Sequence, residues 1–332
     1  MRAIELGEFG GPEVLEVAEV AVPAPGPGQV SIDVAYAGVN YAELKARAEG
    51  YRVESLPHRP GLEVSGRVRA LGEGVTGLAV GQEVAALTGS GGYAEVALAD
   101  ATTVFPLPDG VDLRTAAALP TVLPTAQALV HRVGRLVPGE TVLVHGAAGG
   151  VGTVLGQLAK AAGAGAVYGT VSSPAKADHA RRHGYDEVFT GDFEQDPRAL
   201  EKAVRAATGD RGVDLVLDPV GGETLKASLA SLAVFGRLVS FGNASAAEPW
   251  QVGQPELYPT GVSVSGWSVL HLAKTAPDAL RALADQAFAK VADGTVTLPV
   301  TAEFPLHQAA EAHRLMASRT STGKLLLRVA GA

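Results

Sequence analysis

Residues 140–173 read ETVLVHGAAGGVGTVLGQLAKAAGAGAVYGTVSS, and this stretch decides the fold of the chain. Its first apolar run, 141–144, predicts a buried parallel strand. A turn rich in glycine follows at 146–152, and apolar residues then recur at helical spacing as far as residue 162. A second apolar run, 166–171, completes a strand–turn–helix–strand unit.

Such a unit is typical of dinucleotide-binding proteins. Glycines let the backbone come close to a pyrophosphate, and the unpaired N–H groups at the start of the helix attract its negative charge. The alternative is a tight turn that binds no ligand, but the flanking strands and helix favour the binding site. The predicted phosphate contacts are Gly146, Ala148, Gly149, Gly150, Val151 and Gly152.

Composition limits the classes of protein that are possible. A chain of 332 residues exceeds the usual size of one hydrophobic core, so two domains are expected. The net charge of −8 argues against a nucleic-acid or anionic-membrane partner. The absence of cysteine excludes disulfides, thiolate nucleophiles and cysteine-bound zinc. With no signal-like leader and no apolar run of about 18 residues, a cytoplasmic protein is expected.

The order of the elements separates two regions. Residues 1–110 show short apolar runs between glycines and prolines, which predicts a small, twisted, partly closed β-barrel. Residues 140–266 alternate between strands and helices, which predicts about six parallel strands. The segment after 268 is too short to fold alone, so we expect it to join the barrel. The expected domains are 1–123 with 268–332, and 124–267.

Several short motifs, in the same order along the chain, carry a resemblance to a known family. Besides the glycine turn, the motifs are AGVN (37–40), PGLEVSG (60–66), VGQEV (80–84), GGYAE (91–95), DPVGG (218–222), SFGN (240–243) and STGKL (321–325). Together they resemble the zinc-independent quinone oxidoreductase branch of the medium-chain dehydrogenase/reductase superfamily. The resemblance implies an α/β protein with a Rossmann doubly wound parallel sheet, a GroES-like β-barrel domain that holds the substrate, and the nicotinamide between them.

The resemblance also bears on metal binding. In the zinc-dependent branch of the superfamily, Asn40 would be cysteine and Leu62 would be histidine. Neither residue supplies the expected ligand, and the eight histidines of the chain show no ligand spacing. We therefore predict no metal site and hydride transfer without a metal ion.

The end of the second strand indicates which nicotinamide cofactor binds. An NAD site usually has an acidic residue there, whereas this strand is followed by Ser172, Ser173 and Lys176. Hydroxyl groups and a cation suit a 2′-phosphate, so the sequence predicts NADPH. The alternative is a serine that caps a helix, followed by a solvated lysine. The family often has a supporting tyrosine where this chain has Gly191, which weakens the preference over NADH.

The resemblance suggests residues for catalysis and for further cofactor contacts. Asn40 is expected near the nicotinamide ribose, and Tyr51 at the mouth of the substrate site as a candidate proton donor. Lys45 is a candidate contact for a polar substrate. The alternatives are that Tyr51 packs on the barrel and that Lys45 is an exposed helix lysine. Further cofactor contacts are expected from Thr125, which could instead cap a helix, and from Phe241, Gly242, Asn243 and Lys324.

The resulting functional prediction is an NADPH-dependent reductase of a quinone or an α,β-unsaturated carbonyl. One alternative is an enoyl-thioester reductase of fatty-acid or polyketide metabolism. Another is an NADPH-binding structural or sensor protein with little turnover. The strand-like run near Val262–Ser265 has no charge or proline against edge pairing, so we expect a homodimer through it. The side chains of Trp250, Tyr258 and Trp267 are expected near the cleft or the subunit contact.

Overall fold

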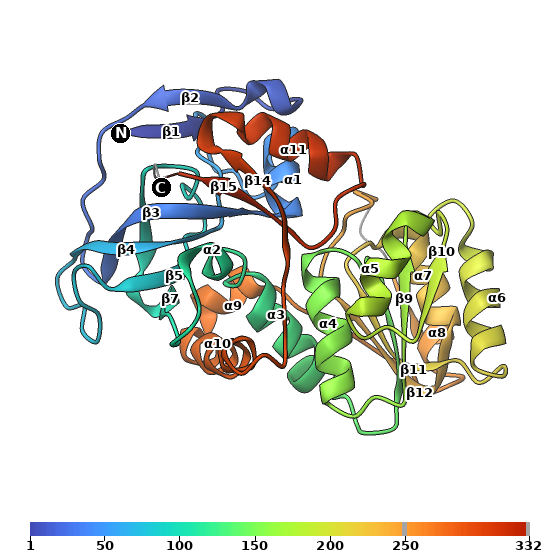
Figure 1. Ribbon diagram of the computed structural model, residues 1–332. Coiled ribbons are helices and arrows are strands. Elements are labelled where there is room, and N and C mark those ends of the chain that lie inside the picture. Colours follow the sequence, from blue (N-terminus) through green and yellow to red (C-terminus); the bar gives the residue numbers. More distant parts are fainter. Residues whose placement is uncertain (248–250, 330–332) are drawn as a thin grey trace. The chain divides into compact units, whose positions relative to one another are not determined.

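A computed structural model describes residues 1–247 and 251–329. The chain forms two compact units, which are visible in Figure 1. Unit 1 comprises Met1–Pro124 and Val269–Ala332, and unit 2 comprises Thr125–Ser268. The domain boundaries expected from the sequence lie one residue earlier at each junction.

Unit 2 is built on a six-stranded sheet in which every neighbouring pair of strands is parallel. The strand order is β10-β9-β8-β11-β12-β13, the doubly wound arrangement predicted from the alternating pattern. The order reverses between β8 and β11, and ligands of such sheets bind beyond the carboxyl ends of the strands at this point. The strands are β8 Thr141–Val144, β9 Ala166–Val171, β10 Glu187–Thr190, β11 Val213–Asp218, β12 Leu232–Ser240 and β13 Ser263–Gly266.

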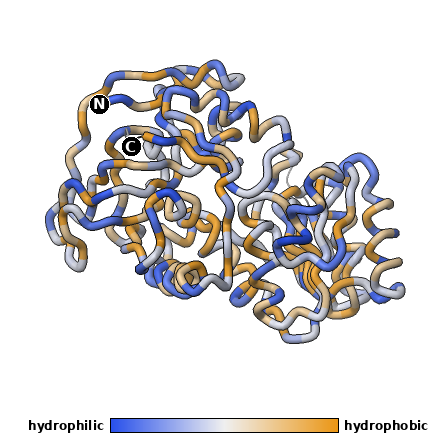
Figure 2. Tube along the Cα trace, viewed as in Figure 1, coloured by the Kyte–Doolittle hydropathy of each residue, from blue (hydrophilic) through white to orange (hydrophobic). Residues whose placement is uncertain are grey.

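Two of the helices of unit 2 share one apolar core with this sheet. Leu143 and Val216 from the strands belong to the same buried cluster as Leu200, Val204 and Leu225 from the helices. Figure 2 shows the strands of this sheet as mostly hydrophobic segments. The helices are α4 Gly150–Ala161, α5 Ala177–Arg182, α6 Pro197–Ala207, α7 Gly222–Ala230 and α8 Gln254–Leu257, and α3 Val122–Ala128 with a π-helical turn, Leu129–Val133, precedes them.

Unit 1 is built on a seven-stranded sheet with the order β14-β15-β3-β4-β5-β7, in which β6 also pairs with β3. A separate hairpin joins β1 and β2. The final strand, β15, pairs antiparallel with β3, so the end of the chain completes the N-terminal sheet. The strands are β1 Arg2–Glu5, β2 Glu16–Glu19, β3 Gln29–Val39, β4 Glu63–Leu71, β5 Glu83–Leu87, β6 Val96–Asp100, β7 Val104–Pro106, β14 Val300–Pro305 and β15 Lys324–Arg328.

The helices of unit 1 surround this sheet (Figure 1). They are α1 Tyr41–Glu49, α2 Leu113–Ala116, α9 Val269–Thr275, α10 Pro277–Ala292 and α11 Ala309–Ala317. The apolar core of the unit joins residues from both chain segments, for example Ile32 and Val64 with Leu325 and Leu327. None of the helices in the described parts of the chain is long and apolar enough to cross a membrane.

Candidate active site

The glycine-rich turn of unit 2 follows β8 and leads into α4. Gly146 has a φ of +67°, a conformation that glycine adopts without strain, and its carbonyl accepts a hydrogen bond of 2.9 Å from the Gly149 N–H. A Cβ atom on Gly152 would lie 2.3 Å from the Gly146 oxygen, so the turn closes only because residue 152 has no side chain. Gly149, the N-cap residue of α4, has no side chain to cap the helix. The N–H groups of residues 150–152 therefore have no intrahelical acceptor, which is the arrangement that favours an anion at a helix N-terminus.

The loops that follow β11 and β12 lie next to this turn and are hydrogen-bonded to each other. The Asp218 carboxylate, on the strand beside β8, accepts hydrogen bonds from the N–H groups of Val220 and Gly221 at 2.6 and 3.1 Å. The Phe241 N–H donates to the Asp218 carbonyl at 2.9 Å. A Cβ atom on Gly242 would lie 2.6 Å from the Pro219 oxygen. These contacts fix the predicted cofactor-contact segment 241–243 at the carboxyl edge of the sheet.

Asn243 is held by its own loop. Its side-chain NH2 donates to the Ala247 carbonyl at 2.8 Å, and its carbonyl oxygen accepts from the Ser245 hydroxyl at 3.1 Å. The orientation of the Asn243 amide is therefore set before any ligand binds, as a preorganised contact requires.

The segment after β9 has the composition expected of a phosphate site. Ser172 is exposed, and Lys176 is half-buried. Ser173 is the N-cap residue of a 3-10 turn, Pro174–Lys176, but its hydroxyl makes no capping hydrogen bond. The segment from Val171 to Lys176 contains no acidic residue.

A buried histidine lies beneath the turn. The imidazole of His145 bonds to the hydroxyl groups of Thr170 at 3.0 Å and Ser228 at 2.8 Å. Burial lowers the pKa of His145 and raises the pKa of Asp218. We assign His145 to the structural support of the strand ends.

Unit 1 contributes a polar cluster that the strand register assembles. Leu325 pairs with Val39 across β15 and β3, and the next pair in this antiparallel register is Lys324 with Asn40. Ala37 pairs with Val64 across β3 and β4, so Glu63 falls beside Gly38. Three strands that are distant in sequence thus place Asn40, Glu63 and Lys324 at one end of the sheet.

The side chains of this cluster are buried and mutually bonded. The Lys324 ammonium lies 2.5 Å from Glu63 Oε1 and also donates to Asn40 Oδ1. The Asn40 NH2 donates to Glu63 Oε1 at 2.9 Å and lies 3.4 Å from Glu43 Oε1. Glu63 is 0% exposed, Glu43 2% and Lys324 3%, whereas Asn40 is half-buried. Asn40 is therefore the member of the cluster that a ligand can reach.

Glu43 has an unusual titration behaviour for a carboxylate. Burial raises its pKa from the usual 4.5 to about 7, although Lys324 and the N–H groups of Leu62 and Asn40 oppose the shift. These N–H groups donate to the two Glu43 oxygens at 2.9 and 2.6 Å. Sequence reasoning missed Glu43, although the spacing Asn40-x-x-Glu43 at a helix start is the signature of a capping box. Glu63 lies inside a quoted motif but was not selected.

The remaining candidates divide between the two units. Lys45 Nζ lies 5.9 Å from the centre of the Tyr51 ring and 3.6 Å from a Glu49 oxygen. The side chain of Lys45 is only 16% exposed, and Tyr51 is 46% exposed. Thr125 is buried in unit 2. The catalytic role of Lys45 and the proton-donor role of Tyr51 stay predictions. Trp250, which was expected near the cleft or the subunit contact, lies outside the described residues.

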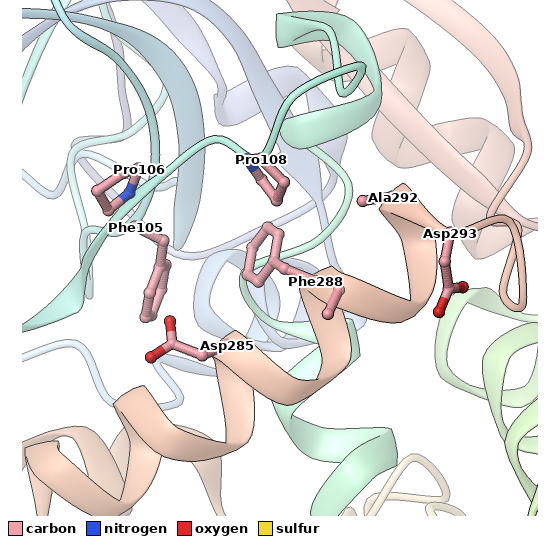
Figure 3. A pocket seen from close by; sticks show the side chains of 8 residues that line it. Phe105, Pro106, Pro108, Asp285, Phe288, Ala292 and Asp293 are labelled. Carbon is pink, nitrogen blue, oxygen red and sulfur yellow. The ribbon is translucent and has the colours of Figure 1, made fainter.

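Unit 1 also has a hollow of about 470 Å³ between the end of β7 and α10 (Figure 3). Its floor is apolar, with Phe105 and Phe288 at a ring distance of 5.6 Å, and Asp285 and Asp293 lie at its rim. No predicted site residue lines it, so we do not place the reaction there.

Within residues 1–247 and 251–329, no group of three or more histidine, cysteine, aspartate or glutamate side chains is arranged to hold a metal ion.

Comparison with known proteins decides the family. Residues 26–109 match the family described as the alcohol dehydrogenase GroES-like domain, and residues 150–285 match the one described as zinc-binding dehydrogenase. A quinone oxidoreductase from Pseudomonas aeruginosa is 36% identical over 98% of this chain and 99% of its own length. The chain belongs to the quinone oxidoreductases of the medium-chain dehydrogenase/reductase superfamily. It is therefore an oxidoreductase, and the family resemblance and fold class predicted from the motifs are confirmed.

A solved structure agrees with this membership. A mycobacterial protein complexed with NADPH superposes with a TM-score of 0.92 at 35% identity, covering 99% of this chain and 100% of its own. A second kind of relative is the phthioceranic/hydroxyphthioceranic acid synthase of Mycobacterium tuberculosis. It is 33% identical over 96% of this chain, but the match covers 15% of the synthase. The same fold therefore also exists as one part of a much larger synthase.

Proposed function

We propose that this chain is an NADPH-dependent oxidoreductase that transfers hydride to a quinone or an α,β-unsaturated carbonyl without a metal ion. The single observation that supports the proposal most strongly is the anion site at residues 150–152, placed where the strand order of the unit 2 sheet reverses. The membership of the quinone oxidoreductases supports the choice of reaction.

The cofactor contacts of the proposal follow from unit 2. The pyrophosphate of NADPH would lie on the turn from Gly146 to Gly152, including Ala148, Gly149, Gly150 and Val151. The 2′-phosphate would lie on Ser172, Ser173 and Lys176, in a segment that contains no acidic residue. The segment 241–243 and Thr125 would contact the part of the cofactor nearer the nicotinamide. Bound NADPH would supply the hydride, and residues of the chain would bind and orient the cofactor and the acceptor.

In this proposal, unit 1 is the domain that binds the substrate. Asn40 offers a preorganised amide, and Tyr51 offers an exposed hydroxyl that could give a proton to an enolate carbon. Metal independence is supported by the cluster itself, because the amide of Asn40 already pairs with a lysine ammonium and Leu62 has no ligand atom.

The experiment that tests the proposal is a substrate panel with NADPH. It contains a small quinone, a short enone and a crotonyl thioester, and the oxidation of NADPH is followed by absorbance. We expect turnover of the quinone or the enone. Turnover of the thioester alone would instead support an enoyl-thioester reductase, the alternative that the similarity to the mycobacterial synthase favours. Tight NADPH binding with no turnover of any acceptor would support the structural or sensor role.

The proposal includes a homodimer that forms through β13. This strand pairs with β12 on one side, and within the described residues no strand pairs with its other side. Ser263, Ser265 and Gly266 are exposed along it, so their edge carries no bulky or charged side chain. Light scattering should give twice the chain mass at micromolar concentration, and Val264→Pro should weaken the dimer. A monomeric unmodified protein, or a folded dimeric Val264→Pro variant, would contradict this interface.

A further inference from the structure

The polar cluster of unit 1 fixes the orientation of the Asn40 amide by chemical necessity. An ammonium group only donates hydrogen bonds and an ionised carboxylate only accepts them. Asn40 Oδ1 therefore faces Lys324, and the Asn40 NH2 faces the Glu63 carboxylate. Rotating the amide by 180° would place its NH2 against the ammonium and its oxygen against the Glu63 carboxylate, which creates repulsion at both ends.

We propose that Lys324 is a positioning residue whose ammonium, held on Glu63, fixes the Asn40 amide so that Asn40 accepts a hydrogen bond from a hydroxyl group of the bound cofactor. This inference rests on the proposed function, because it assigns a role within the same reaction. It also gives Lys324 a task other than direct contact with the cofactor, which the sequence had suggested.

The hydrogen-bonding capacity of Asn40 defines the ligand group. Its two N–H bonds point to Glu63 at 2.9 Å and toward Glu43 at 3.4 Å. One lone pair of Oδ1 is taken by Lys324. The Glu43 N–H donates to the backbone carbonyl of Asn40 at 3.2 Å and makes no capping hydrogen bond to its side chain, so within the described residues the second lone pair of Oδ1 is left. Since Asn40 is the half-buried member of an otherwise buried cluster, this lone pair is available to a hydroxyl donor and unsuited to a phosphate or a carboxylate.

Backbone groups around the Lys324–Glu63 ion pair hold the Glu63 carboxylate in place. Glu63 Oε2 accepts a hydrogen bond of 2.8 Å from the Thr121 N–H, so both carboxylate oxygens are engaged. A Cβ atom on Gly38 would lie 2.3 Å from Glu63 Oε1 and 2.7 Å from the Ala117 carbonyl, so Glu63 fits only because residue 38 is glycine. Ion pairs this deeply buried rarely add stability beyond an apolar pair of the same shape, which favours a role in specificity.

The test is a double-mutant cycle of Lys324→Met and Asn40→Ala, read by the NADPH dissociation constant and by kcat and KM for the accepted quinone or enone. Each single variant is expected to change these constants by about tenfold, the effect of one lost hydrogen bond. Adding Lys324→Met to Asn40→Ala should then change them by less than about twofold, because Lys324 acts through Asn40. Equal effects of Lys324→Met in both backgrounds would overturn the proposal. Arg328→Met is the control on the same strand, because Arg328 is an exposed partner of Glu303 and should leave the constants unchanged.

A second variant covers the case in which Lys324→Met fails to fold because Glu63 is left without its cation. Lys324→Met combined with Glu63→Gln removes both charges and keeps the volume. In this variant the neutral amide at 63 can pair with either end of Asn40, so the orientation of the Asn40 amide is no longer fixed. We expect a folded protein whose KM for NADPH or for the acceptor rises. Unmodified kinetics in this variant would overturn the proposal.

The same four proteins of the cycle are also unfolded with denaturant in the absence of ligand. Coupling between Lys324 and Asn40 in the free energy of unfolding is expected, and its absence would overturn the inference even if the enzyme is active. Clear coupling in a protein that neither binds nor oxidises NADPH would instead show that the proposed function is wrong, and with it the ligand part of the inference.

Discussion

The glycine-rich turn of unit 2 and the polar cluster of unit 1 are assembled in opposite ways. The turn, residues 146–152, is continuous in sequence and depends on missing side chains, since an added Cβ atom at Gly152 would meet the Gly146 oxygen at 2.3 Å. The cluster joins Asn40, Glu63 and Lys324, and its Lys324–Asn40 contact spans 284 positions of the chain. It depends on charged side chains that are buried and paired. In our proposals, the turn would offer backbone donors to an anion, and the cluster would offer one acceptor to a hydroxyl group.

The two regions should therefore respond differently to substitution. Adding atoms should damage the turn, whereas removing a charge should damage the cluster. The following predictions test this contrast, in order of decreasing expected effect.

Gly152→Val should have the largest effect, because a branched side chain cannot fit against the Gly146 carbonyl. The turn would open and at least two backbone contacts to the pyrophosphate would be lost. Two charge-assisted hydrogen bonds correspond to about 3–6 kcal/mol, or roughly 10²–10⁴-fold in NADPH affinity. Fluorescence titration of NADPH measures the change. Gly7→Ala is the control, since its Cβ atom would meet nothing within 4 Å, and unchanged affinity in Gly152→Val would contradict the proposed cofactor site.

Tyr51→Phe should slow the reduction of an enone by roughly 10²-fold. We expect a value at the lower end of the rate effects known for positioned acids, because the Tyr51 side chain is exposed to water. The reduction of a quinone should change little, since its oxygens can take protons from solvent. Steady-state rates on both acceptors measure the ratio. Tyr41→Phe serves as control, because Tyr41 has a similar exposure, 43% against 46%. Equal, small losses on both acceptors would leave Tyr51 with no role as proton donor.

Lys176→Ala should weaken NADPH binding by roughly 10- to 100-fold and leave NADH binding nearly unchanged. The reason is the loss of one charge-assisted contact to the 2′-phosphate, worth about 1.5–3 kcal/mol. Both cofactors are titrated into both proteins, with Lys202→Ala as a surface control. If the unmodified protein bound NADPH and NADH equally well, the assignment of Lys176 would be wrong.

Glu43→Gln should change the pH dependence of stability. The folded protein holds the proton of Glu43 more tightly than the unfolded chain, since the pKa rises from 4.5 to about 7. The stability that this group contributes is therefore full below about pH 4.5 and is lost as the pH rises through 7. Between pH 5 and 8 the unmodified protein should lose on the order of 1–3 kcal/mol relative to Glu43→Gln. Denaturant unfolding at both pH values measures this, and parallel pH profiles would contradict the raised pKa.

The contrast between the regions also explains what could be predicted from the sequence. The parallel sheet of unit 2 could be predicted from the sequence because each strand and helix shows its own periodicity. The glycine turn could be predicted because it is a local motif. The segment with Ser172, Ser173 and Lys176 was also found, because it directly follows a predicted strand.

The cluster of unit 1 was only partly predictable. Asn40 and Lys324 were chosen separately, from family motifs, and nothing in the sequence indicated that their side chains touch. That contact depends on the pairing register of β15 with β3, a long-range property that the turns and strand lengths do not encode locally. Glu43 and Glu63 were missed because a buried carboxylate looks like a surface one in sequence. Only the capping-box spacing of Asn40 and Glu43 indicated that one of these two carboxylates, Glu43, has a structural role.

The most direct test of the account is the rate of NADPH oxidation by a small quinone before and after exhaustive chelation, with the zinc content of the protein measured in parallel. We predict that the rate is unchanged and that no stoichiometric zinc is present, because Asn40 is paired with Lys324 and Leu62 has no ligand atom. Stoichiometric zinc that is lost together with the activity would contradict the account.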